Sequence, residues 1–272
     1  MARAGPDRGA VTPVVPDERG EVTGEPGPVA LVGSGEFLDV MVPVDAALLA
    51  GRPRRAVVIP TASALEGDER VAYWLDLGRR HYEAMDVEVV PLDVRTRQDA
   101  DDPALGAAVA GAGLVYLSGG NPAHLSATLR DTALWAAVER AWREGTALGG
   151  CSAGAMALSA GAPAELFAAR DDPAAPASPG RAAAGGGLGV VPGVAVIPHF
   201  DQMERWRPGA VDWFQAWQPL GTVLVGIDER TALVQAQGRW HVEGLGSVWV
   251  ITGEGRTPHG PGSTVPLPAA PA

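Results

Sequence analysis

A serine flanked by small residues is the side chain in this sequence best suited to act as a nucleophile. Residues 150–154 (GCSAG) match the G-x-S-x-G pattern, in which a strand turns sharply into a helix and holds the central serine above a sheet edge. A short apolar strand is expected over 147–149 and a helix after the motif, which is the context that the pattern requires. The sequence therefore predicts covalent catalysis through Ser152.

The single cysteine lies next to this serine. Cys151 stands one position before the apex of the turn, where a side chain points away from the exposed edge, so we expect a small buried residue rather than a nucleophile. One cysteine also excludes an intrachain disulfide and a cysteine-rich zinc site. The histidines lack metal-ligand spacing on a common element, so the sequence predicts neither a metal nor a cofactor.

A second glycine-rich turn could supply the hydrogen-bond donors that acyl transfer requires. Residues 118–122 (SGGNP) follow an apolar strand expected over 114–117 and open a helix, with Asn121 as its cap. Successive glycines before a helix N-terminus expose backbone N–H groups, which can stabilise an oxyanion. We expect the N–H groups of Gly120 and Ala153 to form this pair. Taken alone, the segment is equally well explained as an ordinary strand-to-helix turn.

Five histidines compete for the role of general base. His199 directly follows an apolar strand expected over 194–197, and parallel sheets display their active-site side chains at the carboxyl ends of strands. His81 is expected on a charged helix face, His124 on a helix surface and His241 within a strand, while the fifth lies in the C-terminal tail. His199 is therefore the favoured base.

Four strings occur along the chain in the order GGNPAHL, GCSAGAM, PHF and GIDERTAL. Their residues, order and spacing resemble the cyanophycinase and aspartyl dipeptidase (dipeptidase E) family of serine peptidases, over roughly residues 29–253. The resemblance implies a class I glutamine amidotransferase-like, flavodoxin-like fold and a Ser–His–Glu triad. Carried onto this sequence, Ser152 is the nucleophile, His199 the general base and Glu229 the carboxylate that orients the imidazole.

The resemblance also implies a small peptide substrate, from one of two branches. The cyanophycinase branch carries Asp-Gln before the histidine and several arginines after it, whereas Ile197 and Pro198 precede it here. The P-H-F form is closer to the dipeptidase branch, which cleaves after an N-terminal aspartate and needs a cation for that carboxylate. We expect Asn121, Arg205 and Arg207 to bind substrate, with a solvated helix face as the alternative role of the arginines.

Alternating strands and helices must position these residues. Short apolar runs separated by helical patterns are expected as strands over 29–32, 56–59, 87–90, 114–117 and 147–149. This alternation predicts an α/β fold with a doubly wound, mostly parallel sheet sandwiched by helices. Closely spaced short strands after Thr231 predict an antiparallel end to the sheet.

The ends of the chain and one internal stretch have a different composition. Residues 1–27 and 256–272 are rich in Pro and Gly without periodicity, so we expect disordered tails around one domain over 28–255. The Ala/Pro/Gly-rich stretch over 168–187 is expected to be a mobile lid or a tolerated insertion.

The charged residues exclude several mechanisms and partners. All 21 basic residues are arginine, so the chain lacks the lysine of a Walker phosphate loop, a Schiff-base amine and a Ser–Lys dyad. With 32 acidic residues the net charge is −11, which disfavours nucleic acid and anionic membranes as partners. The N-terminus lacks the apolar core of a signal peptide, so the cytoplasm is the expected location. A homodimer is compatible with the sequence.

Two other functions stay open at this point. An α/β-hydrolase esterase has the chain order serine, acid, histidine, which would join Ser152, Glu229 and His241. The strand pattern around His241 argues against this arrangement, because that fold places its histidine in a loop. A non-catalytic amidotransferase-like binding protein is the third hypothesis, and the presence of all three triad residue types argues against it.

Overall fold

The computed structural model describes residues 25–161, 186–217 and 221–268. The expected N-terminal tail over 1–27 therefore lies almost wholly outside the described residues, as does most of the stretch over 168–187. Within the described ranges, no helix is both long and apolar enough to cross a bilayer.

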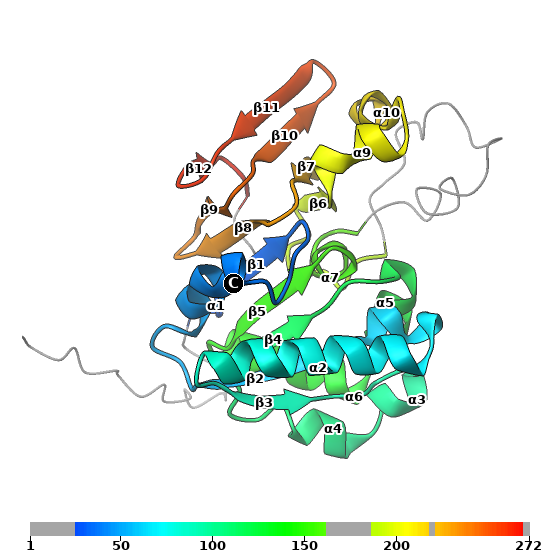
Figure 1. The fold of residues 1–272 in the computed structure, drawn as a ribbon, viewed down its shortest axis with the longest axis vertical. Coiled ribbons are helices and arrows are strands. Elements are labelled where there is room, and N and C mark those ends of the chain that lie inside the picture. The colour runs from blue at the N-terminus through cyan, green and yellow to red at the C-terminus, as the bar shows by residue number, and fades with distance from the viewer. Residues whose placement is uncertain (1–24, 162–185, 218–220, 269–272) are drawn as a thin grey trace, which may run out of the picture.

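An eight-stranded sheet forms the centre of the molecule (Figure 1), in the order β12-β9-β8-β1-β5-β4-β2-β3. Five of its strands are parallel, namely β1 (Val29–Val32), β2 (Arg55–Ile59), β3 (Glu88–Pro91), β4 (Leu114–Leu117) and β5 (Ala147–Cys151). Three antiparallel strands extend it beyond β1, namely β8 (Thr231–Ala236), β9 (Arg239–Gly244) and β12 (Thr264–Val265). The mostly parallel, doubly wound sheet expected from the sequence is confirmed.

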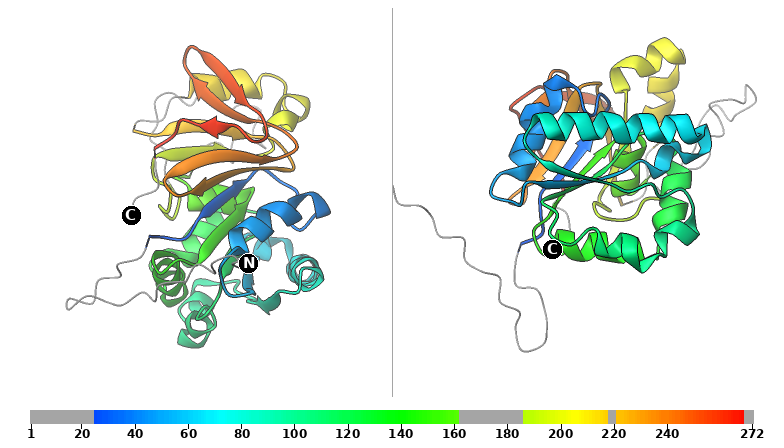
Figure 2. Two further views of the ribbon diagram at one scale, coloured as in Figure 1. Left: turned by 90° about the vertical axis from the view of Figure 1, so that its left-hand side faces the viewer. Right: turned by 60° about the horizontal axis from the view of Figure 1, so that its bottom comes forward.

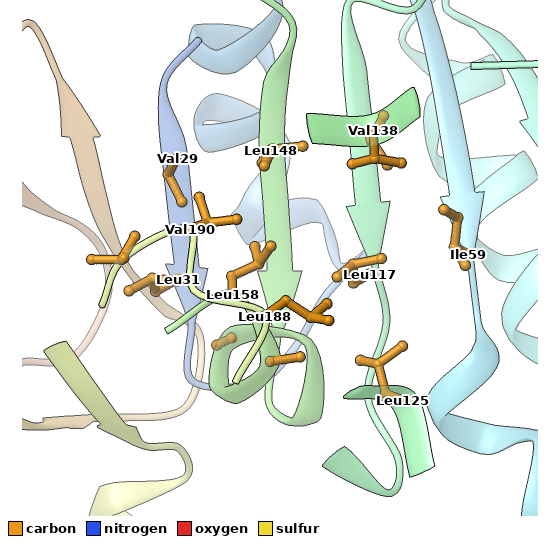
Figure 3. Packing of buried hydrophobic residues seen from close by; sticks show 14 of the residues in the cluster. Val29, Leu31, Ile59, Leu117, Leu125, Val138, Leu148, Leu158, Leu188 and Val190 are labelled. Carbon is orange, nitrogen blue, oxygen red and sulfur yellow. The ribbon is translucent and has the colours of Figure 1, made fainter. Parts of the chain in front are cut away.

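Helices cover both faces of this sheet because alternate strand residues point to opposite sides. On one face, Ala30 and Val32 share a core with residues of the helices α1 (Val42–Leu49) and α2 (Asp68–Ala84). On the other, Val29 and Leu31 pack with α5 (Pro122–Leu129), α6 (Ala133–Arg143) and α7 (Ala153–Leu158). Figure 3 shows Leu148 and Leu117 of the parallel strands facing the same core. Shorter helical segments complete this part, namely the 3₁₀ helices over Asp39–Met41 and Thr61–Glu66 and the helices α3 (Arg97–Ala100) and α4 (Pro103–Ala107).

A second, four-stranded sheet has the order β11-β10-β7-β6. It consists of β6 (Val194–Ile197), β7 (Val223–Ile227), β10 (Val248–Thr252) and β11 (Gly255–His259). The helices α9 (Phe200–Trp206) and α10 (Ala210–Ala216) share a separate apolar core with this sheet. In the left view of Figure 2 these yellow helices and the orange and red C-terminal strands form one end of the molecule. The short antiparallel strands expected near the C-terminus are thus present, although two of them belong to a sheet that the sequence did not predict.

The described part of the C-terminal segment differs from the disordered tail expected over 256–272. Strand β11 pairs along its length with β10, and β12 pairs with β9. Val265 is buried, and the indole N–H of Trp240 donates to the carbonyl of Pro268 at 2.7 Å. Each of these strands is too short to show an alternating hydrophobic pattern. Its ordered conformation depends on pairing with distant strands, which the composition does not reveal.

Candidate active site

Ser152 lies at a sharp turn between β5 and α7, as the G-x-S-x-G pattern predicts. Its backbone has φ 49° and ψ −107°, a conformation that L-residues rarely adopt. The turn is possible because its two glycines lack a Cβ: one added at Gly150 would lie 2.6 Å from the Gly154 backbone, and one at Gly154 would lie 2.1 Å from the carbonyl oxygen of Leu117. The Ser152 N–H donates to the carbonyl of Val32 at 2.9 Å, which fixes the turn at the carboxyl edge of the sheet.

His199 approaches this serine from the second sheet. It follows β6 and directly precedes α9, with a left-handed backbone at φ 53° and ψ 35°. Its Nε2 lies 3.0 Å from Ser152 Oγ, and its Nδ1 lies 3.0 Å from Glu229 Oε1. A carboxylate only accepts hydrogen bonds, so Nδ1 carries the proton and Nε2 accepts from the serine hydroxyl. The neutral imidazole is therefore in the tautomer that a general base requires.

Glu229 reaches His199 because β6 and β7 are parallel neighbours, with Ile197 level with Gly226. His199 and Glu229 both lie just beyond the carboxyl ends of these strands. The backbone N–H of Glu229 donates to Asp201 Oδ1 of α9 at 2.8 Å, which ties its loop to the helix that directly follows His199. The side chains of His199 and Glu229 are 25% and 29% exposed, so a substrate can reach the imidazole from solvent.

The glycine turn after β4 lies beside the serine. A Cβ added at Gly119 would lie 3.6 Å from Ser152 Cβ. Gly120 has φ 138°, and a Cβ there would lie 2.3 Å from the carbonyl oxygen of Ala62, so this position requires glycine. Within the described ranges, neither the Gly120 N–H nor the Ala153 N–H has a hydrogen-bond acceptor. Both groups are therefore available to a ligand at Ser152.

The three expected substrate-binding residues have different surroundings. Asn121 Oδ1 accepts from the backbone N–H of His124 at 2.9 Å, so this side chain caps α5 and only its amide nitrogen is left for a ligand. Arg205 is exposed on the last turn of α9, four residues after Asp201 and hence on the helix face turned to the Glu229 loop. Arg207 follows the end of the same helix and is also exposed.

An aromatic side chain that the sequence analysis did not single out lies against the base. The ring centroids of Trp206 and His199 are 5.2 Å apart, and Trp206 is 54% exposed. Trp206 follows His199 by seven residues, or two helical turns, which places both on one side of α9. An exposed indole at this position offers an apolar contact surface to a bound peptide.

Glu36 is a second residue that sequence reasoning missed. This carboxylate is 6% exposed and accepts from the Gly119 N–H at 3.0 Å and from Cys151 Sγ at 2.7 Å. Its signal in the sequence is an acidic residue in the turn GSGEF directly after β1, at the same sheet edge as the serine. A short glycine-containing turn gives no indication of which way its acid points, so only the tertiary structure places Glu36 beneath the site.

Cys151 is fully buried, as expected from its position before the apex. Burial raises the pKa of its thiol well above the usual value, and the neighbouring Glu36 raises it further. The thiolate is the reactive form, so a buried thiol with a raised pKa is inert. We expect iodoacetamide to leave native Cys151 unmodified at mildly alkaline pH and to alkylate it fully once the chain is unfolded, as measured by intact-mass spectrometry. Rapid alkylation of the folded protein together with loss of activity would contradict this assignment.

The other histidines have partners other than Ser152, and one of them differs from its prediction. His81 is buried on α2, not exposed on a charged face, and its Nε2 lies 2.7 Å from Asp45 Oδ2. Burial raises the pKa of Asp45, and the hydrogen bond with His81 opposes this shift. His124 Nε2 lies 3.0 Å from the carbonyl of Arg95.

His241 lies on β9, between β8 and β12, where its Nε2 is 3.5 Å from Glu243 Oε1. The alternative grouping of Ser152, Glu229 and His241 is therefore not assembled, since Glu229 pairs with His199.

Comparison with known proteins decides the family. The sequence model of peptidase family S51 matches residues 30–242. The chain belongs to this family. A cyanophycinase of Geminocystis herdmanii (strain PCC 6308) is 30% identical over 204 residues, which cover 72% of this chain and 69% of that protein. A cyanophycinase of Synechococcus elongatus is 31% identical over 199 residues, covering 71% of this chain and 57% of the relative.

Solved structures agree with the S51 assignment. A peptidase from an acI-B1 Actinobacterium superposes with a TM-score of 0.77 at 33% identity, covering 88% of this chain and 96% of that one. A putative peptidase E protein of Listeria monocytogenes EGD-e has a TM-score of 0.57 at 18% identity, covering 81% and 99%, and this likeness concerns the fold alone. The resemblance stated from the sequence is thus confirmed, and this S51 protein is a hydrolase of the serine peptidase class.

Proposed function

We propose that this S51 protein hydrolyses small peptides through an acyl-enzyme formed on Ser152, with His199 as general base and Glu229 as the carboxylate that orients it. One observation carries the proposal: a single imidazole hydrogen-bonds Ser152 Oγ and Glu229 Oε1, at 3.0 Å each. A nucleophile bonded to a base that is itself oriented by a third group is the arrangement that activates a serine.

Acylation follows from these distances. Ser152 Oγ attacks the peptide carbonyl carbon while His199 Nε2 takes the hydroxyl proton, so that the C–O bond forms as the carbonyl π bond breaks. The oxyanion accepts hydrogen bonds from the free N–H groups of Gly120 and Ala153, and the positive end of α7 adds to this stabilisation. His199 then gives its proton to the leaving amine as the C–N bond breaks.

Deacylation repeats these steps with water as the nucleophile. His199 takes a proton from the attacking water as the new C–O bond forms. When the tetrahedral intermediate collapses, the bond to Ser152 Oγ breaks and His199 returns the proton to this oxygen. In both halves the imidazole becomes positively charged for part of the cycle. The Glu229 carboxylate 3.0 Å away stabilises that charge and keeps Nδ1 protonated in the neutral state.

The substrate class that we propose is a small peptide with an acidic residue next to the scissile bond, cleaved in a dipeptidase E-like or cyanophycinase-like reaction. Two relatives carry the name cyanophycinase, the P-H-F string is closer to the dipeptidase branch, and the site is open to solvent. The chain has no lysine, so arginine or backbone N–H groups must bind the acidic side chain. We keep the cytoplasm as the proposed location.

The test is a dipeptide panel of Asp-Xaa, isoAsp-Xaa and β-linked Asp-Arg compounds, combined with a fluorophosphonate probe and intact-mass spectrometry. We expect one probe adduct on Ser152 and hydrolysis of at least one member with an acidic residue before the scissile bond. Hydrolysis limited to the β-linked arginine compounds would place the protein in the cyanophycinase-like class. No adduct and no hydrolysis would instead favour the non-catalytic binding protein.

Arg205 is the arginine that we expect to hold the acidic side chain of the substrate. Arg205→Ala should raise KM for acidic dipeptides about tenfold, because a hydrogen bond to a charged group contributes about 1.5–3 kcal/mol. The kcat value should change little, since this contact is equally strong before and during reaction. Arg239→Ala, an exposed arginine at the start of β9, is the matched control. An unchanged KM in the Arg205 variant would exclude this role.

A further inference from the structure

We propose that Glu36 is a positioning residue that holds together the two backbone segments of the oxyanion-binding site. The inference rests on the proposed function, because it concerns the site at Ser152. Glu36 accepts one hydrogen bond from the turn that carries Gly120 and one from the residue that precedes Ser152. Its two carboxylate oxygens thereby connect the ends of three neighbouring strands, β1, β4 and β5.

The first contact fixes the glycine turn. The N–H of Gly119 donates to Glu36 Oε1 at 3.0 Å, and the N–H of Asn121 donates to the carbonyl of Ala62 at 2.7 Å. The N–H groups on either side of Gly120 are thus both occupied, which leaves the Gly120 N–H as the free donor of this turn. Gly119 has no side chain to resist rotation of its backbone. Glu36 supplies that resistance.

The second contact fixes the segment that presents Ser152. Cys151 Sγ donates to Glu36 Oε2 at 2.7 Å, and the next backbone N–H, that of Ser152, donates to the carbonyl of Val32. Ala153 follows directly, so its free N–H depends on the same anchored backbone. One carboxylate therefore sets the distance between both proposed oxyanion donors, Gly120 and Ala153.

Burying the Glu36 carboxylate is energetically unfavourable unless other groups compensate for its lost hydration. Glu36 is 6% exposed, and no arginine or histidine forms an ion pair with it among the described residues. Removing a carboxylate from water is unfavourable unless its oxygens receive hydrogen bonds. A side chain that only filled space here would be apolar, since the neighbouring Phe37 and Tyr116 belong to a hydrophobic core. Among the described residues, the two hydrogen bonds of the Glu36 side chain both go to the proposed catalytic segments.

The role predicts a defined kinetic effect. The oxyanion exists only after attack by Ser152, so a loosened pair of donors weakens binding of the transition state and leaves substrate binding nearly unchanged. Removing one donor from an oxyanion hole typically lowers kcat about 10²–10³-fold. Loss of the support for a donor should have a smaller effect. We expect kcat of Glu36→Ala to fall about 10–100-fold, with KM within about twofold of wild type.

The experiment compares three variants of the full chain, measured on the best substrate of the dipeptide panel. Glu36→Gln keeps an oxygen that can accept from Gly119 and an N–H₂ group that can donate to Cys151 Sγ, so kcat should stay within about threefold of wild type. Cys151→Ala removes only the second contact, and its kcat should fall about threefold. The rate of Ser152 phosphonylation by the fluorophosphonate probe should fall in parallel with kcat, and circular dichroism reports folding.

Several outcomes decide against the proposal. Unchanged kcat in Glu36→Ala overturns it, and so does an equal loss in Glu36→Gln and Glu36→Ala, because the charge would then matter and not the hydrogen bonds. If Glu36→Ala does not fold, Glu36→Asp, whose carboxylate is one methylene shorter, takes its place, with the same expected loss of kcat and the same overturning result. Ser152→Ala distinguishes a failure of the proposed function from a failure of the role of Glu36. Activity that survives in that variant refutes the proposed function, whereas normal kcat in Glu36→Ala with inactive Ser152→Ala refutes only the role of Glu36.

Discussion

Replacing Ser152 by alanine is expected to lower kcat by at least about 10⁴-fold while the protein stays folded. The hydroxyl 3.0 Å from His199 Nε2 is the proposed nucleophile, and alanine removes it without adding volume to the turn. Residual hydrolysis would come only from the oxyanion donors and from substrate binding. Initial rates on the dipeptide panel and the complete absence of the fluorophosphonate adduct are the measurements.

Ser152→Gly is the matched control, because both variants lack the hydroxyl but differ in the backbone conformations they allow. At φ 49° and ψ −107° the native serine is strained, and alanine retains this strain whereas glycine does not. We expect the glycine variant to be equally inactive and about 1 kcal/mol more stable to urea than the alanine variant. This difference would show that the fold holds the serine in a strained conformation. Equal stability of both variants would mean that the turn has relaxed, and substantial activity in either would remove Ser152 from the mechanism.

Local features account for what could be predicted from the sequence. The serine turn was predictable because the glycine spacing and the flanking strand and helix lie within one short segment, and a turn this tight tolerates few other residues. His199 was predictable because it directly follows an apolar strand, and the active-site residues of parallel sheets gather at that edge. Glu229 depended on the resemblance of the GIDERTAL string to a known family, since no local pattern marks that acid as a partner of the imidazole.

Contacts between distant segments account for what could not be predicted. Glu36 lies 83 positions from Gly119 and 115 from Cys151, and its turn after β1 looks like any polar loop. His81 appears in the charged string RRHYE, but it lies on the buried face of α2. There its imidazole hydrogen-bonds the carboxylate of Asp45 on α1. In both cases a polar side chain is buried because a partner from another element satisfies it.

The division into two sheets also required the structure. Ser152 lies at the carboxyl end of β5 in the main sheet, whereas His199 and Glu229 follow strands of the second sheet. The apolar runs of β6 and β7 resemble those of the main sheet, so their pattern does not indicate which sheet they join. The proposed triad therefore lies where the two sheets meet, and its distances depend on how they pack.

The last prediction separates the two candidate bases. His199→Ala is expected to lower kcat by at least about 10⁴-fold and to slow fluorophosphonate labelling of Ser152 to a similar degree, because no other imidazole in the described ranges hydrogen-bonds its hydroxyl. His241→Ala should change both rates by less than about twofold, since His241 lies on β9 beside Glu243. The two variants remove the same group, so a general effect of losing a histidine would appear in both.

Backbone conformation supplies a further check on the His199 result. His199 has a left-handed backbone at φ 53°, which asparagine tolerates better than alanine, so His199→Asn keeps the turn into α9 with less strain. If His199→Ala lost activity only by disturbing that turn, His199→Asn would recover much of it. An amide is not a proton acceptor of comparable basicity, so we expect His199→Asn to stay as inactive as His199→Ala and to unfold at a higher temperature. Recovery of activity in the asparagine variant, or loss of labelling in His241→Ala, would require a different base and would restore the arrangement of serine, acid and histidine found in α/β-hydrolases.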